Sequence, residues 1–283
     1  MSTATNVLSF LRWRVVALRY AGKASAGPGA WLRGAAPTRG RIAGAVLERG
    51  HEPGPTLTPE VLAQIQCIYQ PRSAGVVPKA SGHPFVNLVQ PEDFTPTNPV
   101  FRHAFSPEVL DVASDYFGGR PTLDSIQVLH SWPTEGPPRD SQAWHKDYGD
   151  NKSFHCITYL NDVQGPLKGP FVYVDRADTR RIRRSPFIRR ITDEQFAREL
   201  GSGQVRVFEA RAGESVFVDP AACYHYGSRC RTPRLAIFVT FNTDRPFVPA
   251  TDPIRQNASA ILAAARQVRP DLHESALRGL LRL

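Results

Sequence analysis

Between residues 123 and 243 the chain is a series of short apolar segments broken by turns, and this pattern narrows the choice of fold more than any other feature. The segments include SIQVLHSW, FHCITYLNDV, GPFVYVD, QVRVFEA, ESVFVDP and RLAIFVTFNT. Several alternate apolar and polar residues with a period of two and are rich in Val, Ile, Phe and Tyr, which is typical of half-buried strands. Turns with Gly, Pro and Asp separate them, so we expect a mainly β protein with flanking helices, an antiparallel jelly roll or cupin-like barrel.

The segments on either side of this β region predict helices. Residues 58–70 and the run SPEVLDVASDYFG each begin with a hydroxyl residue followed by proline, the pattern of a capped helix start. IRQNASAILAAARQV and DLHESALRGLLRL predict further helices near the C-terminus, whereas residues 21–57 are rich in Gly, Ala, Pro and Arg and predict a linker. We therefore expect three parts: a basic N-terminal helix and linker (1–57), a double-stranded β-helix domain with flanking helices (58–252) and a C-terminal helical tail (253–283).

The net charge of +9 comes from two segments. Residues 1–50 carry +7 and residues 176–190 carry +6, so the rest of the chain is mildly acidic. The sequence has no zinc-finger spacing, no aromatic RNA-binding motif and no basic region with heptads, and we expect no nucleic-acid partner. The four cysteines form no C-x-x-C pair, which predicts free thiols rather than a disulfide framework or a zinc site.

Residues 5–20 have apolar side chains at helical spacing with arginines between them. Arg12 and Arg14 interrupt the apolar core that an export signal would need, and no run approaches the ~18 apolar residues that span a bilayer. We expect a cytoplasmic protein. The basic amphipathic helix either rests on an anionic membrane surface, as a peripheral contact, or packs on the body of the protein.

The stretch SQAWHKDYGD, residues 141–150, raises the question of chemistry. Residues two apart in a strand point to the same face, so His145 and Asp147 can aim at one point. His225 precedes another strongly β-forming run, and antiparallel strands could bring it alongside His145. Two histidines and one carboxylate form the face that binds Fe(II) and leaves positions open for oxygen and a co-substrate. An H-x-D pair alone is weak evidence.

Arg234 opens the strand RLAIFVTF and adds weight to this hypothesis. A buried guanidinium needs a carboxylate to meet it, and its planar fork can bind one with two hydrogen bonds. A dicarboxylate that chelates the metal at one end and meets an arginine at the other would fit. The alternative is an arginine at a strand end that reaches solvent.

The motifs SQAWHKD, ITYLNDV, GPFVYV and HYGSR, followed by an arginine at a strand start, occur in this order over about residues 120–245. Together they resemble the phytanoyl-CoA dioxygenase-like family of iron(II)- and 2-oxoglutarate-dependent oxygenases, which are built on a double-stranded β-helix. The resemblance implies that His145, Asp147 and His225 bind the iron. It also implies that Arg234 holds the distal carboxylate of 2-oxoglutarate.

Two further cofactor-pocket positions follow from the resemblance. Tyr159 matches an aromatic residue beside the co-substrate, and Gln127 falls where the family often has another pocket residue, although it could equally be an ordinary polar strand residue. The chain departs from the family pattern twice. The residues DRAD follow GPFVYV in place of Pro-Gly-Ser-His, and the short spacing from His225 to Arg234 leaves Arg231 as a weaker rival.

The resemblance implies Fe(II), 2-oxoglutarate and O2 as cofactors, with release of succinate and CO2. Related halogenases have a small residue where this chain keeps Asp147, which favours hydroxylation, or else desaturation or ring formation. We expect a small or carrier-borne organic substrate. The substrate could be anionic, because the arginine-rich segment 176–190 follows a strand at the mouth of the expected site. The expected substrate contacts are Trp144, Arg180 and Arg181, although the basic segment could equally be a solvated loop.

Two other classes of function remain open. One is a double-stranded β-helix protein that binds a ligand or partner without turnover, which a test for iron-dependent succinate release would distinguish. The other is a basic nucleic-acid or membrane-surface adaptor, which rests on the charge of residues 1–50 alone.

Overall fold

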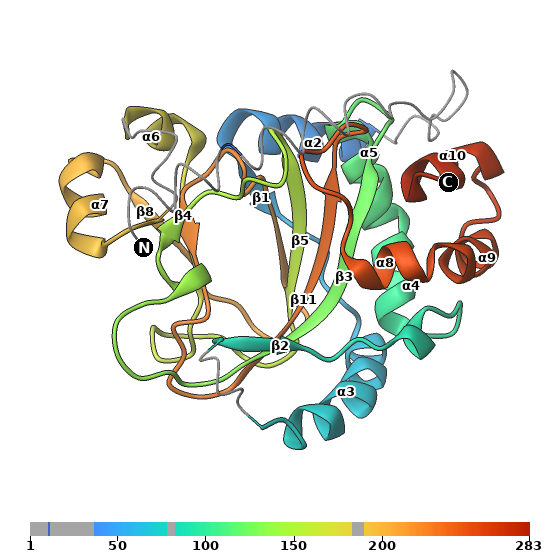
Figure 1. Ribbon diagram of the computed structural model, residues 1–283, viewed down its shortest axis with the longest axis horizontal. Helices are drawn as coiled ribbons and strands as arrows, with labels where there is room; N and C mark the ends of the chain where they lie inside the picture. Colours follow the sequence, from blue (N-terminus) through green and yellow to red (C-terminus); the bar gives the residue numbers. More distant parts are fainter. Residues whose placement is uncertain (1–10, 12–36, 78–82, 183–189) are drawn as a thin grey trace.

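The computed structural model describes residue 11 and residues 37–77, 83–182 and 190–283 (Figure 1). Two antiparallel sheets face each other. The larger contains β1 (His51–Pro53), β2 (Phe85–Asn87), β3 (Thr122–Ser131), β5 (Ser153–Tyr159), β9 (Ser215–Val218) and β11 (Arg234–Asn242). The smaller contains β4 (Trp144–His145), β6 (Phe171–Val174), β7 (Arg190–Ile191), β8 (Val205–Phe208) and β10 (His225–Tyr226).

The strand order is β1-β9-β5-β11-β3-β2 in the larger sheet and β7-β4-β10-β6-β8 in the smaller one. Strands that are neighbours in space are mostly distant in sequence, as in a jelly roll. Each of the six apolar segments singled out in the sequence contains one strand, so the predicted mainly β class is confirmed.

Helices cover the outer faces of both sheets (Figure 1). Those against the larger sheet are α2 (Pro37–Arg49), α3 (Pro59–Ala74), α4 (Pro99–Phe105), α5 (Val112–Tyr116), α8 (Asp252–Gln256), α9 (Ala258–Val268) and α10 (Glu274–Leu281). Those beside the smaller sheet are α6 (Arg176–Arg181) and α7 (Asp193–Leu200). Short helical turns are η1 (Pro91–Asp93), η2 (Pro107–Asp111) and η3 (Asp140–Gln142).

Three apolar clusters follow from these layers. The largest lies between the larger sheet and its helices, a second between the two sheets, and a third between the smaller sheet and α6 and α7. The middle cluster includes Ile157 and Tyr159 from β5 and Phe171 and Tyr173 from β6. These side chains define the inner face of each sheet. The residues between them along the same strands point the other way, toward the helices.

The linker predicted over residues 21–57 is wrong for its second half. Helix α2 buries Ala43 and Val46 in the main core, and β1 adds an edge strand by pairing His51 with Val218 of β9. Gly, Ala and Arg gave no strong local signal, so packing against the rest of the fold decided the structure. The C-terminal helices also join the main core. The three-part division at residues 57 and 252 gains no support from these contacts and stays a prediction.

The predicted capped start of α3 is confirmed, because the Thr58 hydroxyl accepts from the N–H of Val61 at 3.4 Å. The SPEVLDVASDYFG segment is helical too, but it begins with a π-helical turn and the Ser106 side chain makes no capping bond. All four cysteines are free, as predicted. The predicted N-terminal helix over residues 5–20 lies outside the described residues, apart from Leu11. Within the described part of the chain, no helix has the length and apolar character needed to cross a membrane.

Candidate metal centre

Strands β4 and β10 bring His145 and His225 together. The two residues are direct partners in the antiparallel pairing, and their ring centroids are 4.2 Å apart. Asp147 Oδ1 lies 3.6 Å from the Nε2 atom of His145 and 3.7 Å from that of His225. One ligand atom from each residue lies within 4.8 Å of the other two, so the three side chains could hold one metal ion. The sequence predicted this convergence, while iron as the bound ion stays a proposal.

The expectation that His145 and Asp147 project from one strand is wrong. Strand β4 ends at His145, and Asp147 lies in the loop that follows. Its backbone N–H donates to the carbonyl oxygen of Pro220 at 2.9 Å. The carboxylate therefore reaches the centre through a contact between loops rather than through the alternation of a strand.

Hydrogen bonds orient both imidazole rings. Nδ1 of His145 lies 2.8 Å from the carbonyl oxygen of Ala143, and Nδ1 of His225 lies 3.0 Å from that of Cys223. A carbonyl only accepts, so each Nδ1 carries a proton and each Nε2 is the ring nitrogen that can bind a metal. Burial, with the neighbouring His225 ring, lowers the pKa of His145 to about 3. The ring is therefore neutral near pH 7, the form that binds metals.

A buried carboxylate holds the turn that leads into His225. The side chain of Asp219 is 1% exposed, accepts from the N–H groups of Ala221 and Ala222 at 3.0 and 3.1 Å, and pairs with Arg176 at 2.7 Å. Tyr116 also donates to it. No sequence motif marked Asp219 as part of the site, although an Asp-Pro pair at a strand end is a turn signal.

Arg234 is buried at the start of β11, with 2% of its surface exposed. Its guanidinium donates to the carbonyl of Gly169 at 2.5 Å and to the hydroxyls of Ser228 and Ser131 at 2.8 and 3.4 Å. Among the described residues these partners include no carboxylate, and Nε has no partner. A buried charge without a counter-ion is costly, so this position suits an anionic ligand. The rival Arg231 is exposed.

The two other predicted pocket residues lie on the inner face of the larger sheet. Tyr159 is buried, and its ring centroid lies 5.9 Å from the Arg234 guanidinium carbon. Its hydroxyl already donates to the carbonyl oxygen of Phe208 and accepts from the backbone N–H of Phe171. The ring therefore offers a ligand an apolar surface and not a polar contact. Gln127 is partly buried and pairs with Phe238 of β11. Their contact with a co-substrate stays a prediction.

The three predicted substrate contacts do not gather at the centre. Trp144 is buried against α7, where its ring stacks on Phe196 at a centroid distance of 3.7 Å. Arg180 and Arg181 are exposed in the last turn of α6, and Arg181 pairs with Asp178 at 3.2 Å. Neither arginine contacts the three candidate ligands. Substrate binding by these residues stays a prediction, and the packing of Trp144 gives it no support.

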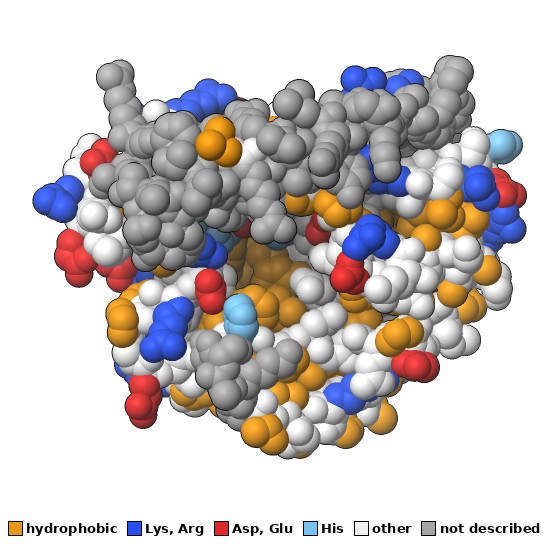
Figure 2. All heavy atoms as spheres, viewed as in Figure 1, with side chains coloured by type: hydrophobic (Ala, Val, Ile, Leu, Met, Phe, Trp, Pro, Cys, Tyr) orange, Lys and Arg blue, Asp and Glu red, His pale blue; other side chains and the backbone are white. Residues whose placement is uncertain are grey.

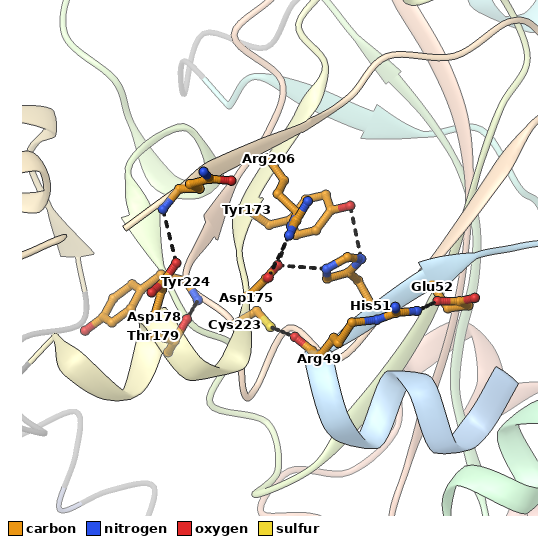
Figure 3. Close-up of polar contacts among 11 residues, drawn as sticks. Arg49, His51, Glu52, Tyr173, Asp175, Asp178, Thr179, Arg206, Cys223 and Tyr224 are labelled. Carbon is orange, nitrogen blue, oxygen red and sulfur yellow. Dashed lines mark hydrogen bonds and ion pairs between the residues drawn. The ribbon is translucent and has the colours of Figure 1, made fainter. Parts of the chain in front are cut away.

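A polar cluster that no sequence motif predicted joins the edges of the two sheets (Figure 3). His51 of β1 meets Asp175 at 2.8 Å, and Asp175 also pairs with Arg206 of β8 at 2.5 Å. The other ring nitrogen of His51 lies 3.4 Å from the hydroxyl of Tyr173, the cross-strand neighbour of His225. Burial lowers the pKa of His51, and the neutral ring can donate to Asp175 while accepting from Tyr173. The cluster closes the barrel beside the candidate ligands.

The surface is hollowed between the sheets (Figure 2). Hydrophobic side chains line much of this hollow, with charged and histidine side chains around its rim. A separate cavity of about 480 Å³ lies on the far side of the larger sheet and is lined by residues that include Thr58, Arg102 and Arg269. None of the predicted site residues lines this cavity, so it is distinct from the candidate metal centre.

No protein-family model matches the chain, and no curated protein matches it in sequence. Solved structures match it in fold. One is the non-heme α-ketoglutarate-dependent epimerase SnoN from nogalamycin biosynthesis, with a TM-score of 0.51 and 15% identity over 72% of this chain and 80% of that one. Another is the carbocyclase SnoK from the same biosynthesis, with a TM-score of 0.51 and 16% identity over 73% and 83% of the two chains.

EctD from S. alaskensis, solved with 2-oxoglutarate and 5-hydroxyectoine, has a TM-score of 0.51 and 16% identity over 72% of this chain and 75% of that chain. At this identity the likeness establishes the fold. The chain therefore has a cupin-like jelly roll, the fold of these solved structures.

Proposed function

We propose that this protein is an Fe(II)- and 2-oxoglutarate-dependent dioxygenase that hydroxylates a small or carrier-borne organic substrate. The observation that carries the proposal is the convergence of His145, Asp147 and His225 in a barrel that also contains the buried Arg234. The shared fold with SnoN, SnoK and EctD supports it.

The side chains of His145, Asp147 and His225 suit the binding of Fe(II). Two imidazole Nε2 atoms and one carboxylate oxygen are the ligands of the facial triad, which leaves positions open. When bound, Fe(II) with 2-oxoglutarate and O2 supplies the oxidation of a substrate C–H bond, with release of succinate and CO2. Arg234 would hold the distal carboxylate of 2-oxoglutarate, because its fork suits a carboxylate and Ser228 and Gly169 already fix its orientation. The wall beside it is the ring of Tyr159.

Hydroxylation is the proposed outcome because Asp147 occupies the carboxylate position of the triad. The titles of similar structures name other outcomes on this fold, an epimerase and a carbocyclase. Product analysis by mass spectrometry would separate the three results, since hydroxylation adds one oxygen atom, ring closure removes two hydrogens and epimerisation leaves the mass unchanged.

The proposal also covers the substrate class, the family and the cellular location. SnoN was solved with nogalamycin RO and EctD with 5-hydroxyectoine, both small molecules. A carrier-bound or anionic substrate, membership of the phytanoyl-CoA dioxygenase-like family, a cytoplasmic location and peripheral membrane contact through residues 5–20 rest on the sequence alone. Sedimentation with anionic and neutral vesicles would test the membrane contact.

The proposal is tested by succinate release. The purified chain, incubated in air with 2-oxoglutarate and Fe(II), should release succinate above the level of an iron-free sample. Asp147→Ala should abolish this release, whereas Arg231→Ala, which changes an exposed arginine close in sequence to Arg234, should not. Binding of both cofactors without succinate would instead indicate a binding module without turnover.

A further inference from the structure

A third histidine, His155, faces the candidate metal centre from the opposite sheet. It lies in β5, where it pairs with Val218 of β9 and Thr240 of β11. Ile157 and Tyr159, two and four residues further on, pack between the sheets, so His155 shares the inner face with them.

The imidazole of His155 points to the far oxygen of Asp147. Asp147 Oδ1 is the oxygen close to His145 and His225, whereas Oδ2 lies 3.7 Å from Nε2 of His155. The separation is about 0.8 Å longer than an ordinary N–H···O hydrogen bond. The side chain of Asp147 is 34% exposed. The two carboxylate oxygens of Asp147 therefore face different groups. Oδ1 faces His145 and His225, and Oδ2 faces His155.

His155 is partly buried at the inner face of the larger sheet. Its side chain is 15% exposed, yet within the described part of the chain neither ring nitrogen has a hydrogen-bond partner. Buried polar groups normally have one, and an exception often marks a functional position. A neutral imidazole has one N–H to donate.

We propose that His155 is a positioning residue for Asp147, in which its Nε2–H donates to Oδ2 and leaves Oδ1 to bind the metal. The inference rests on the proposed function. A carboxylate that binds through both oxygens occupies an extra coordination position, which the facial triad must keep open. Outer partners of this kind fix the orientation of ligating carboxylates, and their loss typically costs ~10- to 100-fold in metal affinity or activity.

His103 provides a matched control. It is another buried histidine that contacts β5, but on the outer face of the strand, where Nε2 lies 3.1 Å from the hydroxyl of Thr158. Burial lowers the pKa of His103 to about 4. The two histidines therefore differ mainly in what they face, and a change at His103 reports the general cost of altering a buried imidazole here.

The experiment is an anaerobic titration of the metal-free protein with Co(II), followed by its visible spectrum, which responds to coordination number. His155→Phe keeps a planar ring without a donor and should weaken Co(II) binding about tenfold and alter the spectrum. His155→Gln keeps an N–H donor and should restore the spectrum and most of the affinity. His103→Gln should change neither. Circular dichroism checks that each variant folds, and His155→Leu replaces the phenylalanine variant if that one does not.

The outcomes separate this inference from the proposed function. Equal Co(II) affinity and spectra in the wild-type protein and in a folded variant without a donor would overturn the role of His155 alone. Loss of affinity in His155→Gln equal to that in His155→Phe would also overturn it, because a donor at this position would then be irrelevant. A folded wild-type protein that binds neither Co(II) nor Fe(II) would overturn both proposals.

Discussion

The backbone N–H of Asp147 donates to the carbonyl oxygen of Pro220 at 2.9 Å, which ties the loop after β4 to the turn between β9 and β10. That turn leads directly into His225, so two of the three candidate ligands depend on one short connection. Asp219 fixes the connection from within, because its carboxylate accepts from backbone N–H groups of the same turn.

Asp219→Ala should therefore damage both stability and metal binding. The substitution leaves Arg176 without its buried partner and frees the turn, and removing one member of a buried ion pair costs about 3 kcal/mol. Urea denaturation would measure the loss, and a Co(II) titration of the folded fraction should show weaker affinity. The control is Asp193→Ala, since Asp193 is 49% exposed and its pair with Arg229 should contribute less than about 1 kcal/mol. Equal effects of the two substitutions would refute the argument.

Arg234→Lys should weaken 2-oxoglutarate binding at least about tenfold and leave metal binding nearly unchanged. Lysine keeps the charge but loses the planar fork that can meet a carboxylate with two hydrogen bonds. Isothermal titration of the Mn(II)-loaded protein with 2-oxoglutarate would show the loss. Arg231→Lys is the matched control and should bind as the wild type does. The role of Arg234 would be untenable if both variants bound 2-oxoglutarate equally well.

The metal-free protein should lose stability as the pH falls from about 6.5 to 4, partly through His103. Burial lowers the pKa of His103 to about 4, whereas the unfolded chain protonates it near 6.5. Between these values the unfolded chain binds more protons, so the free energy of unfolding decreases as the pH decreases. His103→Gln should reduce this slope by up to about 1.4 kcal/mol per pH unit. Urea denaturation in chelator at pH 7, 6 and 5 would measure it, and an unchanged slope would contradict the burial argument.

Helix α2 and strand β1 should be needed for a stable barrel. A chain that begins at residue 54 loses the buried Val46 and the pairing of His51 with β9, and we expect it to be at least about 3 kcal/mol less stable than a chain that begins at residue 37. Thermal denaturation of the two truncated chains provides the comparison. Similar melting temperatures would show that this segment is dispensable.

Local patterns in the sequence predicted the longer strands and the side-chain cluster of the candidate metal centre. The period-two runs predicted the sheets, and the H-x-D motif with His225 predicted a cluster because antiparallel pairing places such residues side by side. Features that depend on distant packing could not be read in this way. Whether Trp144 faces a substrate or Phe196 is decided by α7, and the positions of Asp219 and His155 follow from strand register. The segment around α2 lacked a strong local signal and folds through its partners.

The most direct test of the central claim is anaerobic addition of Fe(II) and 2-oxoglutarate to the purified protein, followed by visible absorption. If His145, Asp147 and His225 hold iron and Arg234 holds the distal carboxylate, the weak charge-transfer band of the chelate appears. It should be reduced in both Asp147→Ala and Arg234→Ala. A folded wild-type protein that shows no band would contradict the claim and favour a ligand-binding barrel without turnover.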